Sequence, residues 1–121
     1  MVIKIVIVED ESIVALDLKQ RLELLKYEIV GIAATGADAI ELVKTNEVDL
    51  ILMDIILKGK LNGIETAILI KEEFNIPIIY NSANSDFKTL KEIKKTEPYG
   101  YLVKPFDDNK LEQAIKSILK L

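Results

Sequence analysis

The sequence predicts an α/β domain built around a parallel sheet. Short apolar runs of strand length alternate five times with longer segments of helical periodicity, an order typical of a parallel sheet with crossover helices. The runs are also almost continuously hydrophobic, as strands buried on both faces of a sheet must be. With 121 residues, the chain has the length of a single domain, 1–121, with its own core.

The first half of the chain contains three predicted strands and two predicted helices. The strands are expected at about 2–8, 28–34 and 48–53, and the last should be central because only Asp49 interrupts its apolar residues. A helix at about 37–45 follows the turn at Thr35-Gly36. The first helix is expected at about 12–25, with apolar positions at Ile13, Leu16, Leu18, Leu22 and Leu25.

The second half continues the alternation. Helices are expected from about 63, at about 86–96 and from about 108 to the last residues, with strands at about 77–81 and 100–103. Residues that favour helix N-caps precede these helices: Asn62, Ser85, and Asp107 or Asp108. Asn62 is followed by Glu65, the spacing of a capping box.

The composition excludes several kinds of chemistry. The chain has neither cysteine nor histidine, so disulfides, cysteine–zinc sites and phosphohistidine are ruled out. A covalently held phosphoryl group would therefore sit on Asp, Glu, Ser, Thr or Tyr. The net charge is −4 and Arg21 is the only arginine, so direct binding to nucleic acid is not expected. No apolar stretch has the length of a membrane span, the start lacks the layout of a signal peptide, and we expect a cytoplasmic protein without membrane contact.

Polar residues follow four of the predicted strands at the point where each strand ends. Glu9 and Asp10 follow the first strand, Asp54 the third, Ser82 the fourth and Lys104 the fifth. Because the carboxyl ends of parallel strands share one edge of a sheet, these side chains should meet there, where ligands bind in such sheets. Three carboxylates repel one another unless a cation lies among them. The group therefore predicts a pocket for a metal cation and a phosphoryl group.

Taken singly, each of these residues has a simpler interpretation. The acidic pair could cap a helix, and Asp54 could be a turn residue after a core strand. Ser82 could be a loop residue, Lys104 a solvent-exposed lysine and Tyr101 an ordinary strand aromatic.

Five motifs in their order along the chain resemble the receiver domain of two-component response regulators. They are Val8-Glu9-Asp10-Glu11, Leu52-Met53-Asp54-Ile55, Asn62-Gly63-Ile64-Glu65, Asn81-Ser82-Ala83 and Tyr99-Gly100-Tyr101-Leu102-Val103-Lys104-Pro105-Phe106. The resemblance covers the whole chain. It implies a three-layer, flavodoxin-like (βα)5 fold with parallel strand order 2-1-3-4-5.

The resemblance also implies roles for individual residues. Asp54 would accept a phosphoryl group from the phosphohistidine of a histidine kinase or phosphotransfer protein. Asp10 would bind Mg²⁺ directly and Glu9 through water, together with Asp54 and the backbone carbonyl of Ile56; Mn²⁺ is an alternative metal. Lys104, before a cis bond to proline, would direct its ammonium at the phosphoryl oxygens.

A switch follows from the same resemblance. Ser82 would move to bind the phosphoryl group and Tyr101 would turn inward, remodelling the face formed by the fourth helix, the fifth strand and the fifth helix. That face is a candidate surface for a homodimer. Ile56 and Asn84 would flank the path of a hydrolytic water, and since neither is a general base, dephosphorylation should be slow. Catalysis would be limited to the domain's own phosphorylation and dephosphorylation.

Two departures and two alternatives accompany this interpretation. Glu9 stands where many receivers have Asp, and the loop at 56–63 is one residue longer than usual and has no proline. A phosphohydrolase of the haloacid-dehalogenase type would need an Asp two residues after its nucleophile, where this chain has Ile56. A receiver that works without phosphorylation would be expected to have lost the acidic pair, Asp54 or Lys104.

Overall fold

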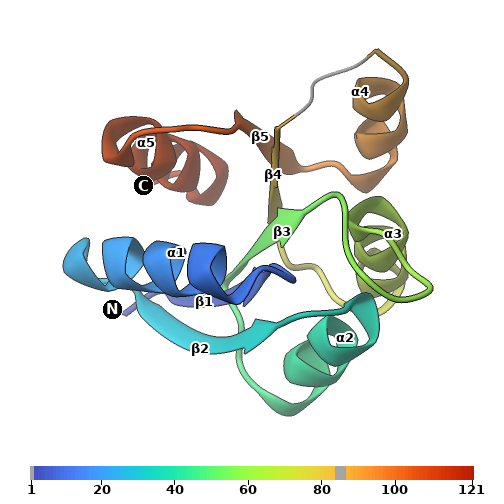
Figure 1. Cartoon of the computed structure of the whole chain (residues 1–121), viewed down its shortest axis with the longest axis horizontal. Coiled ribbons are helices and arrows are strands. Elements are labelled where there is room, and N and C mark those ends of the chain that lie inside the picture. Colours follow the sequence, from blue (N-terminus) through green and yellow to red (C-terminus); the bar gives the residue numbers. More distant parts are fainter. Residues whose placement is uncertain (1, 84–86) are drawn as a thin grey trace.

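The computed structural model of the chain is a five-stranded parallel sheet between two layers of helices (Figure 1). It describes residues 2–83 and 87–121. The elements are β1 (Lys4–Val8), α1 (Ser12–Leu24), β2 (Glu28–Ala33), α2 (Gly36–Thr45), β3 (Leu50–Asp54), α3 (Gly63–Glu73), β4 (Ile78–Ser82), α4 (Phe87–Ile93), the 3-10 turn η1 (Lys94–Thr96), β5 (Tyr99–Val103) and α5 (Asp108–Leu119). The strands lie in the order β2-β1-β3-β4-β5 and each neighbouring pair is parallel. The predicted α/β class, flavodoxin-like architecture and strand order are confirmed.

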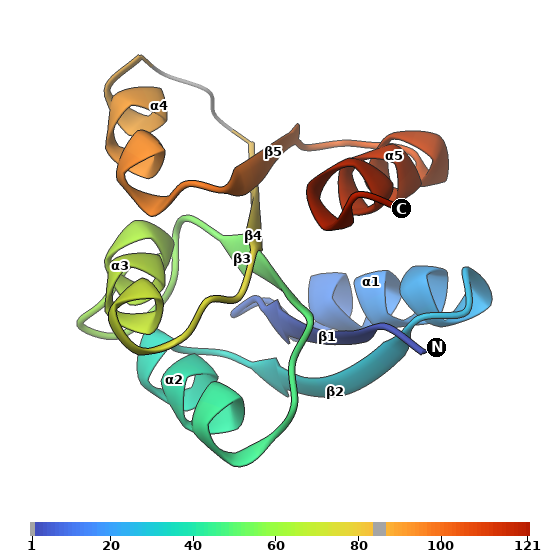
Figure 2. The same ribbon diagram turned by 180° about the vertical axis from the view of Figure 1, so that it is seen from behind.

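The two faces of the sheet carry separate hydrophobic cores. Helices α1 and α5 cover one face, and α2, α3 and α4 cover the other, as the two opposite views show (Figures 1 and 2). Side chains of the central strands alternate between these layers, as the pleat of a strand requires. The α1/α5 core includes Ile5, Ile7, Leu50, Leu52, Ile79 and Leu102. The opposite core includes Val6, Val8, Ile51, Met53, Ile78 and Tyr80.

Within the described residues, three helices begin at side-chain caps. The Thr35 hydroxyl accepts the Asp38 N–H at 3.2 Å at the start of α2. The capping box predicted before α3 is confirmed, because the Asn62 side chain accepts the Glu65 N–H at 2.8 Å and Glu65 accepts the Asn62 N–H at 2.9 Å. Helix α5 is capped by Asp107. The predicted cap Ser85 lies outside the described residues.

The buried face of α1 differs from the prediction. Ala15, Leu18 and Leu22 are almost completely buried, whereas Ile13 is 83% exposed and Leu16 is 53% exposed. The spacing of the three buried residues defines one helical stripe against the sheet. Ile13 and Leu16, two of the five apolar positions of the predicted helix, lie off that stripe and are exposed, so the apolar pattern did not identify the buried face.

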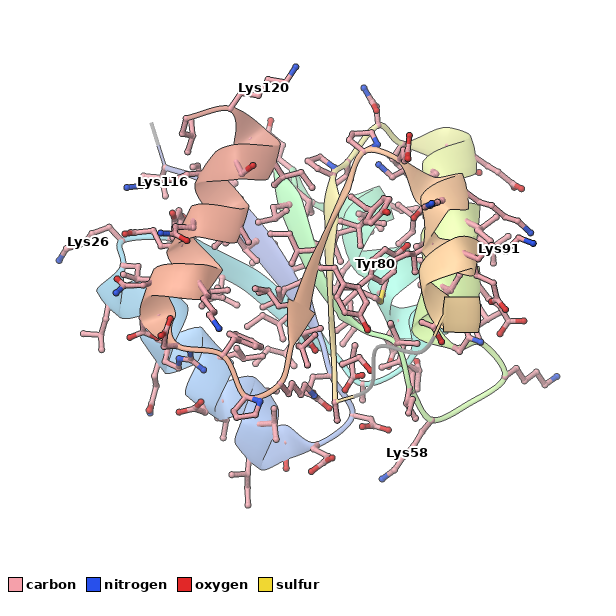
Figure 3. The ribbon with its side chains drawn as sticks, turned by 90° about the horizontal axis from the view of Figure 1, so that it is seen from above. Lys26, Lys58, Tyr80, Lys91, Lys116 and Lys120 are labelled. Atoms are coloured by element: carbon pink, nitrogen blue, oxygen red, sulfur yellow. The ribbon has the colours of Figure 1, made fainter. Side chains whose placement is uncertain are left out.

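The fourth helix is also shorter than expected. Its α-helical part ends at Ile93, which is fully buried, and the chain continues as η1. The Thr96 hydroxyl donates to the Ile93 carbonyl at 2.7 Å and shares a hydrogen bond with the Tyr80 hydroxyl. Figure 3 shows Tyr80 in the interior, on the side of the sheet that α4 covers. These hydrogen bonds connect the 3-10 turn at the end of the helix to β4.

Two further features bear on the predictions. The peptide bond between Lys104 and Pro105 is cis, as the resemblance implied. Within 2–83 and 87–121, no helix combines the length and the hydropathy that crossing a membrane requires.

Candidate functional site

The acidic residues predicted to converge do so at the carboxyl edge of the sheet. Asp54 is the last residue of β3, and Glu9 and Asp10 follow β1, its neighbour in the sheet. One carboxylate oxygen from each of the three lies within 4.8 Å of the others. Glu9 is 2% exposed and Asp54 is 8% exposed, while Asp10 is half-buried. Carboxylates this close are unfavourable without positive charge between them.

Lys104 supplies that charge from the end of β5. Its Nζ donates to Glu9 Oε1 and to Asp54 Oδ2, both at 3.0 Å. Its backbone N–H donates to the Ser82 carbonyl at 2.8 Å, which fixes the start of the side chain beside β4. Burial by itself would lower the pKa of the Lys104 ammonium, but the hydrogen bonds and charges of Glu9 and Asp54 outweigh it and leave the pKa raised. Lys104 is therefore held as a cation between two acids.

Backbone N–H groups of the loop after β3 orient one oxygen of Asp54 and one of Asp10. Asp54 Oδ1 accepts the Ile56 N–H at 3.1 Å, and Asp10 Oδ2 accepts the Lys58 N–H at 3.1 Å. Both donors belong to the loop between β3 and α3, from which the Lys58 side chain projects outward (Figure 3). The loop therefore determines the direction of two of the three acids.

A cavity of about 310 Å³ opens at this cluster. It is lined by Asp10, Glu11, Asp54, Ile56, Lys58, Ser82, Ala83 and Lys104. Five of the predicted site residues are thus brought together around one space. Glu9 does not line the cavity, but it accepts a hydrogen bond from Lys104, which does. A larger cavity of about 630 Å³, lined by Glu97, Pro98 and Tyr99, is unrelated to the cluster.

The two predicted switch residues, Ser82 and Tyr101, lie on the face of the sheet opposite to Asp54 and Lys104. Tyr101 pairs with Tyr80, and Ser82 pairs with Val103, across β4 and β5. Because side chains alternate along a strand, Ser82 and Tyr101 point to the side that α3 and α4 cover. Tyr101 is half-buried and packs against the core on that side, whereas Ser82 also lines the cavity. The predicted switch therefore spans the site and the α4 side of the fold.

One site residue was missed by the sequence reasoning. Asn81, 1% exposed, pairs in register with Asp54. Its sequence signal was a polar residue inside an otherwise apolar run. Asn84, expected beside the phosphoryl group, lies outside the described residues.

The chemistry of the cluster fits a hard divalent cation and a phosphoryl group. Carboxylate oxygens are the ligands that Mg²⁺ prefers in proteins, usually with several waters retained. The cavity also contains a carboxylate, Asp54, that can act as a nucleophile, and an ammonium beside it that can neutralise phosphoryl oxygens. A site of this composition can transfer a phosphoryl group to its own aspartate.

Comparison with known proteins identifies the family. Residues 5–116 match the model of the response regulator receiver domain, and the chain belongs to this family. It is therefore a signalling domain of two-component systems.

Individual relatives agree with this assignment. The transcriptional regulatory protein PdtaR of Mycobacterium tuberculosis is 34% identical over 113 residues, which cover 93% of this chain and 55% of that protein. The chain spans about half the length of the curated relatives it matches.

Two solved structures show how far the fold is shared. The signal receiver domain of a modulated diguanylate cyclase from Desulfovibrio desulfuricans G20 has a TM-score of 0.92 and 32% identity, covering 99% of this chain and 95% of that one. The receiver domain of the sensor histidine kinase PA1611 from Pseudomonas aeruginosa PAO1 has a TM-score of 0.88 and 25% identity, with full coverage of both chains, and holds a magnesium ion in its active site cleft.

Proposed function

We propose that this domain accepts a phosphoryl group on Asp54 from the phosphohistidine of a histidine kinase or phosphotransfer protein. The observation that carries the proposal is the pairing of Asp54 with Lys104 beside two further carboxylates, in a chain of the receiver family. The neighbour that holds magnesium in its cleft supports a metal-dependent site of the same kind here.

Asp10, Asp54 and the Ile56 carbonyl would hold Mg²⁺ directly, and Glu9 would do so through water. The clustered carboxylate oxygens support this ligand set, and Mn²⁺ can take the same place. When bound, the metal supplies positive charge to neutralise the phosphoryl oxygens. Asp10 can keep the hydrogen bond from the Lys58 N–H to its Oδ2 and bind the metal through its other oxygen, Oδ1.

The transfer itself is a substitution at phosphorus. An oxygen of the Asp54 carboxylate forms an O–P bond as the P–N bond of phosphohistidine breaks, and the imidazole leaves with the electron pair and takes up a proton. Charge spreads over the equatorial oxygens, so the protein contributes mainly position and neutralising charge. Lys104, already 3.0 Å from Asp54 Oδ2, is suited to this task.

Ser82 and Tyr101 would respond to the negative charge of the phosphoryl group on Asp54. Ser82 lines the cavity, and Tyr101 lies on the same side of the sheet one strand away. If the Ser82 hydroxyl binds the phosphoryl group, Tyr101 can turn inward, and the face of α4, β5 and α5 is remodelled. We propose this face as the homodimer surface, and we propose protein partners, with no direct contact to nucleic acid or membrane. The cytoplasmic location stays a prediction.

The haloacid-dehalogenase alternative gains nothing from the geometry. Its general acid would occupy the position of Ile56, an apolar side chain that is 71% exposed. We propose that chemistry ends at the domain's own phosphorylation and slow dephosphorylation.

Mass spectrometry tests the proposal directly. The protein is incubated with acetyl phosphate and Mg²⁺, and the modified residue is trapped with borohydride and mapped. We expect modification at Asp54 and none in Asp54→Asn. Asp17→Asn is a matched control, since Asp17 is an exposed helical aspartate paired with Arg21, and it should react like the wild type. Modification of Asp54→Asn at the wild-type rate would contradict the proposal.

A further inference from the structure

Asn81 is a buried polar residue at the site that the proposed function does not use. It lies in β4, where its backbone pairs with Asp54 of β3 and with Leu102 of β5. The residue is 1% exposed, and its Oδ1 has no hydrogen-bond partner among the described residues. Buried polar atoms nearly always have a partner, so an unpaired one beside a reactive aspartate requires an explanation.

The Asn81 side chain lies on the same face of the sheet as Asp54 and Lys104. Two residues before it, Ile79 packs in the core under α1 and α5, and so does Leu102, two residues before Lys104. Side chains at this spacing share a face, and neighbouring strands are about 4.8 Å apart. The Asn81 amide is therefore one strand away from the Asp54 carboxylate, beneath the Lys104 ammonium rather than beside Ser82.

Lys104 has a hydrogen-bonding capacity that matches this orphaned acceptor. An ammonium carries three N–H donors. Two contacts are made, to Glu9 Oε1 and to Asp54 Oδ2. The Lys104 backbone N–H binds the carbonyl of Ser82, and Lys104 lies two residues beyond Leu102, the residue that pairs with Asn81. The ammonium thus has one donor to spare on the face of the sheet that carries the unpaired Asn81 Oδ1.

We infer that Asn81 is a positioning residue that holds Lys104 during phosphoryl transfer, an inference that rests on the proposed function. Before transfer, two carboxylates hold the ammonium. Once the O–P bond has formed, Asp54 is an acyl phosphate whose carboxyl oxygens carry less negative charge, and the ammonium turns to the phosphoryl oxygens. Asn81 Oδ1 then accepts the N–H that Asp54 has released, which keeps the ammonium directed at the phosphoryl group.

Stability distinguishes this role from a structural one. An amide that served packing would be hydrogen-bonded in the resting protein, and its loss would destabilise the fold. Asn81 Oδ1 is unpaired at rest, so replacing Asn81 with Leu, of similar size and branching, should leave Tm equal or higher.

The test measures binding of beryllofluoride, a phosphoryl mimic, at saturating Mg²⁺. We expect Asn81→Leu to weaken beryllofluoride about tenfold, the effect of one hydrogen bond to a charged group, while the Kd for Mg²⁺ alone is unchanged. In a Lys104→Met background, Asn81→Leu should have no further effect, because Asn81 acts through Lys104. The matched control is Thr96→Val: Thr96 is also 1% exposed but is hydrogen-bonded to Ile93, so its loss should lower Tm and leave beryllofluoride affinity unchanged.

Two results would overturn the inference. One is wild-type affinity for beryllofluoride in Asn81→Leu, and the other is an equal loss in the presence and absence of Lys104. If Asn81→Leu does not fold, Asn81→Ala is judged by the same two results. Failure of the wild-type protein to bind beryllofluoride would instead refute the proposed function, so the two failures are distinguishable.

Discussion

The substitution Gly63→Ala tests whether the start of α3 sets the position of Asp54. A Cβ at Gly63 would lie 2.1 Å from the Asp54 carbonyl oxygen and 2.9 Å from the Ile55 Cα. Both contacts are with backbone, so no side chain can turn away to relieve them. The Gly63 N–H also donates to the Ile55 carbonyl at 2.7 Å, which holds the two segments together.

The structure gives the size of the effect. Because Cβ contacts under 3.0 Å are essentially never seen, the Asp54 carbonyl must move away by at least 0.9 Å. Forcing extra volume into a packed site costs about 1–3 kcal/mol of stability. A displacement of about 1 Å at a reacting group can reduce its rate about 10²-fold. We therefore expect Gly63→Ala to fold with reduced stability and to accept phosphoryl about 10²-fold more slowly.

The assay follows phosphorylation by acetyl phosphate with intact-mass spectrometry and unfolding by urea. Gly31→Ala is the matched control, because the nearest atoms to a Cβ there belong to the Leu42 side chain, at 3.0 Å or more, and a side chain can shift where a backbone cannot. It should change stability by no more than about 0.5 kcal/mol and leave the rate unchanged. A Gly63→Ala protein that is phosphorylated at the wild-type rate would refute the reasoning.

Three further predictions follow from the site and the core. Asp10→Ala should lose more Mg²⁺ affinity than Glu9→Ala in a metal titration, because Asp10 lines the cavity while Glu9 accepts a hydrogen bond from Lys104. A larger loss in Glu9→Ala would show that Glu9, not Asp10, is the direct ligand. Ile56→Asn should shorten the lifetime of the phosphorylated state, because a polar side chain at this exposed position beside Asp54 can orient a water; an unchanged decay, followed by intact mass, would contradict the slow reset. Burial raises the pKa of Tyr80 from 10.0 to about 12. Folding therefore favours the neutral form of Tyr80. The resulting contribution to the free energy of unfolding, of the order of 3 kcal/mol, is fully present below pH 10 and is lost as the pH rises to 12. Tyr80→Phe should accordingly lose less stability than the wild type between pH 10 and 12 in thermal melts, and parallel losses would contradict the assignment.

Much of the fold and site was predictable because the evidence is local in the sequence. Continuous apolar runs predict buried parallel strands, and the polar residues that end them predict one edge of the sheet. The capping box at Asn62 and Glu65 fixed the start of α3 to the residue. The local pattern did not predict which face of α1 is buried. Ile13 and Leu16 fit a helical repeat but are exposed, because the orientation of α1 depends on the surface of the sheet on which it packs.

By itself, the sequence determined which residues reach the carboxyl edge of the sheet, since that depends only on where each strand ends. Only the tertiary structure decided which partner each residue has there. It brought Lys104 between Glu9 and Asp54, directed the Lys58 N–H toward Asp10, and left Asn81 Oδ1 buried without a hydrogen-bond partner among the described residues. The physical reason is that these contacts join residues up to 95 positions apart, so they depend on strand order and register, which no short stretch of the chain encodes.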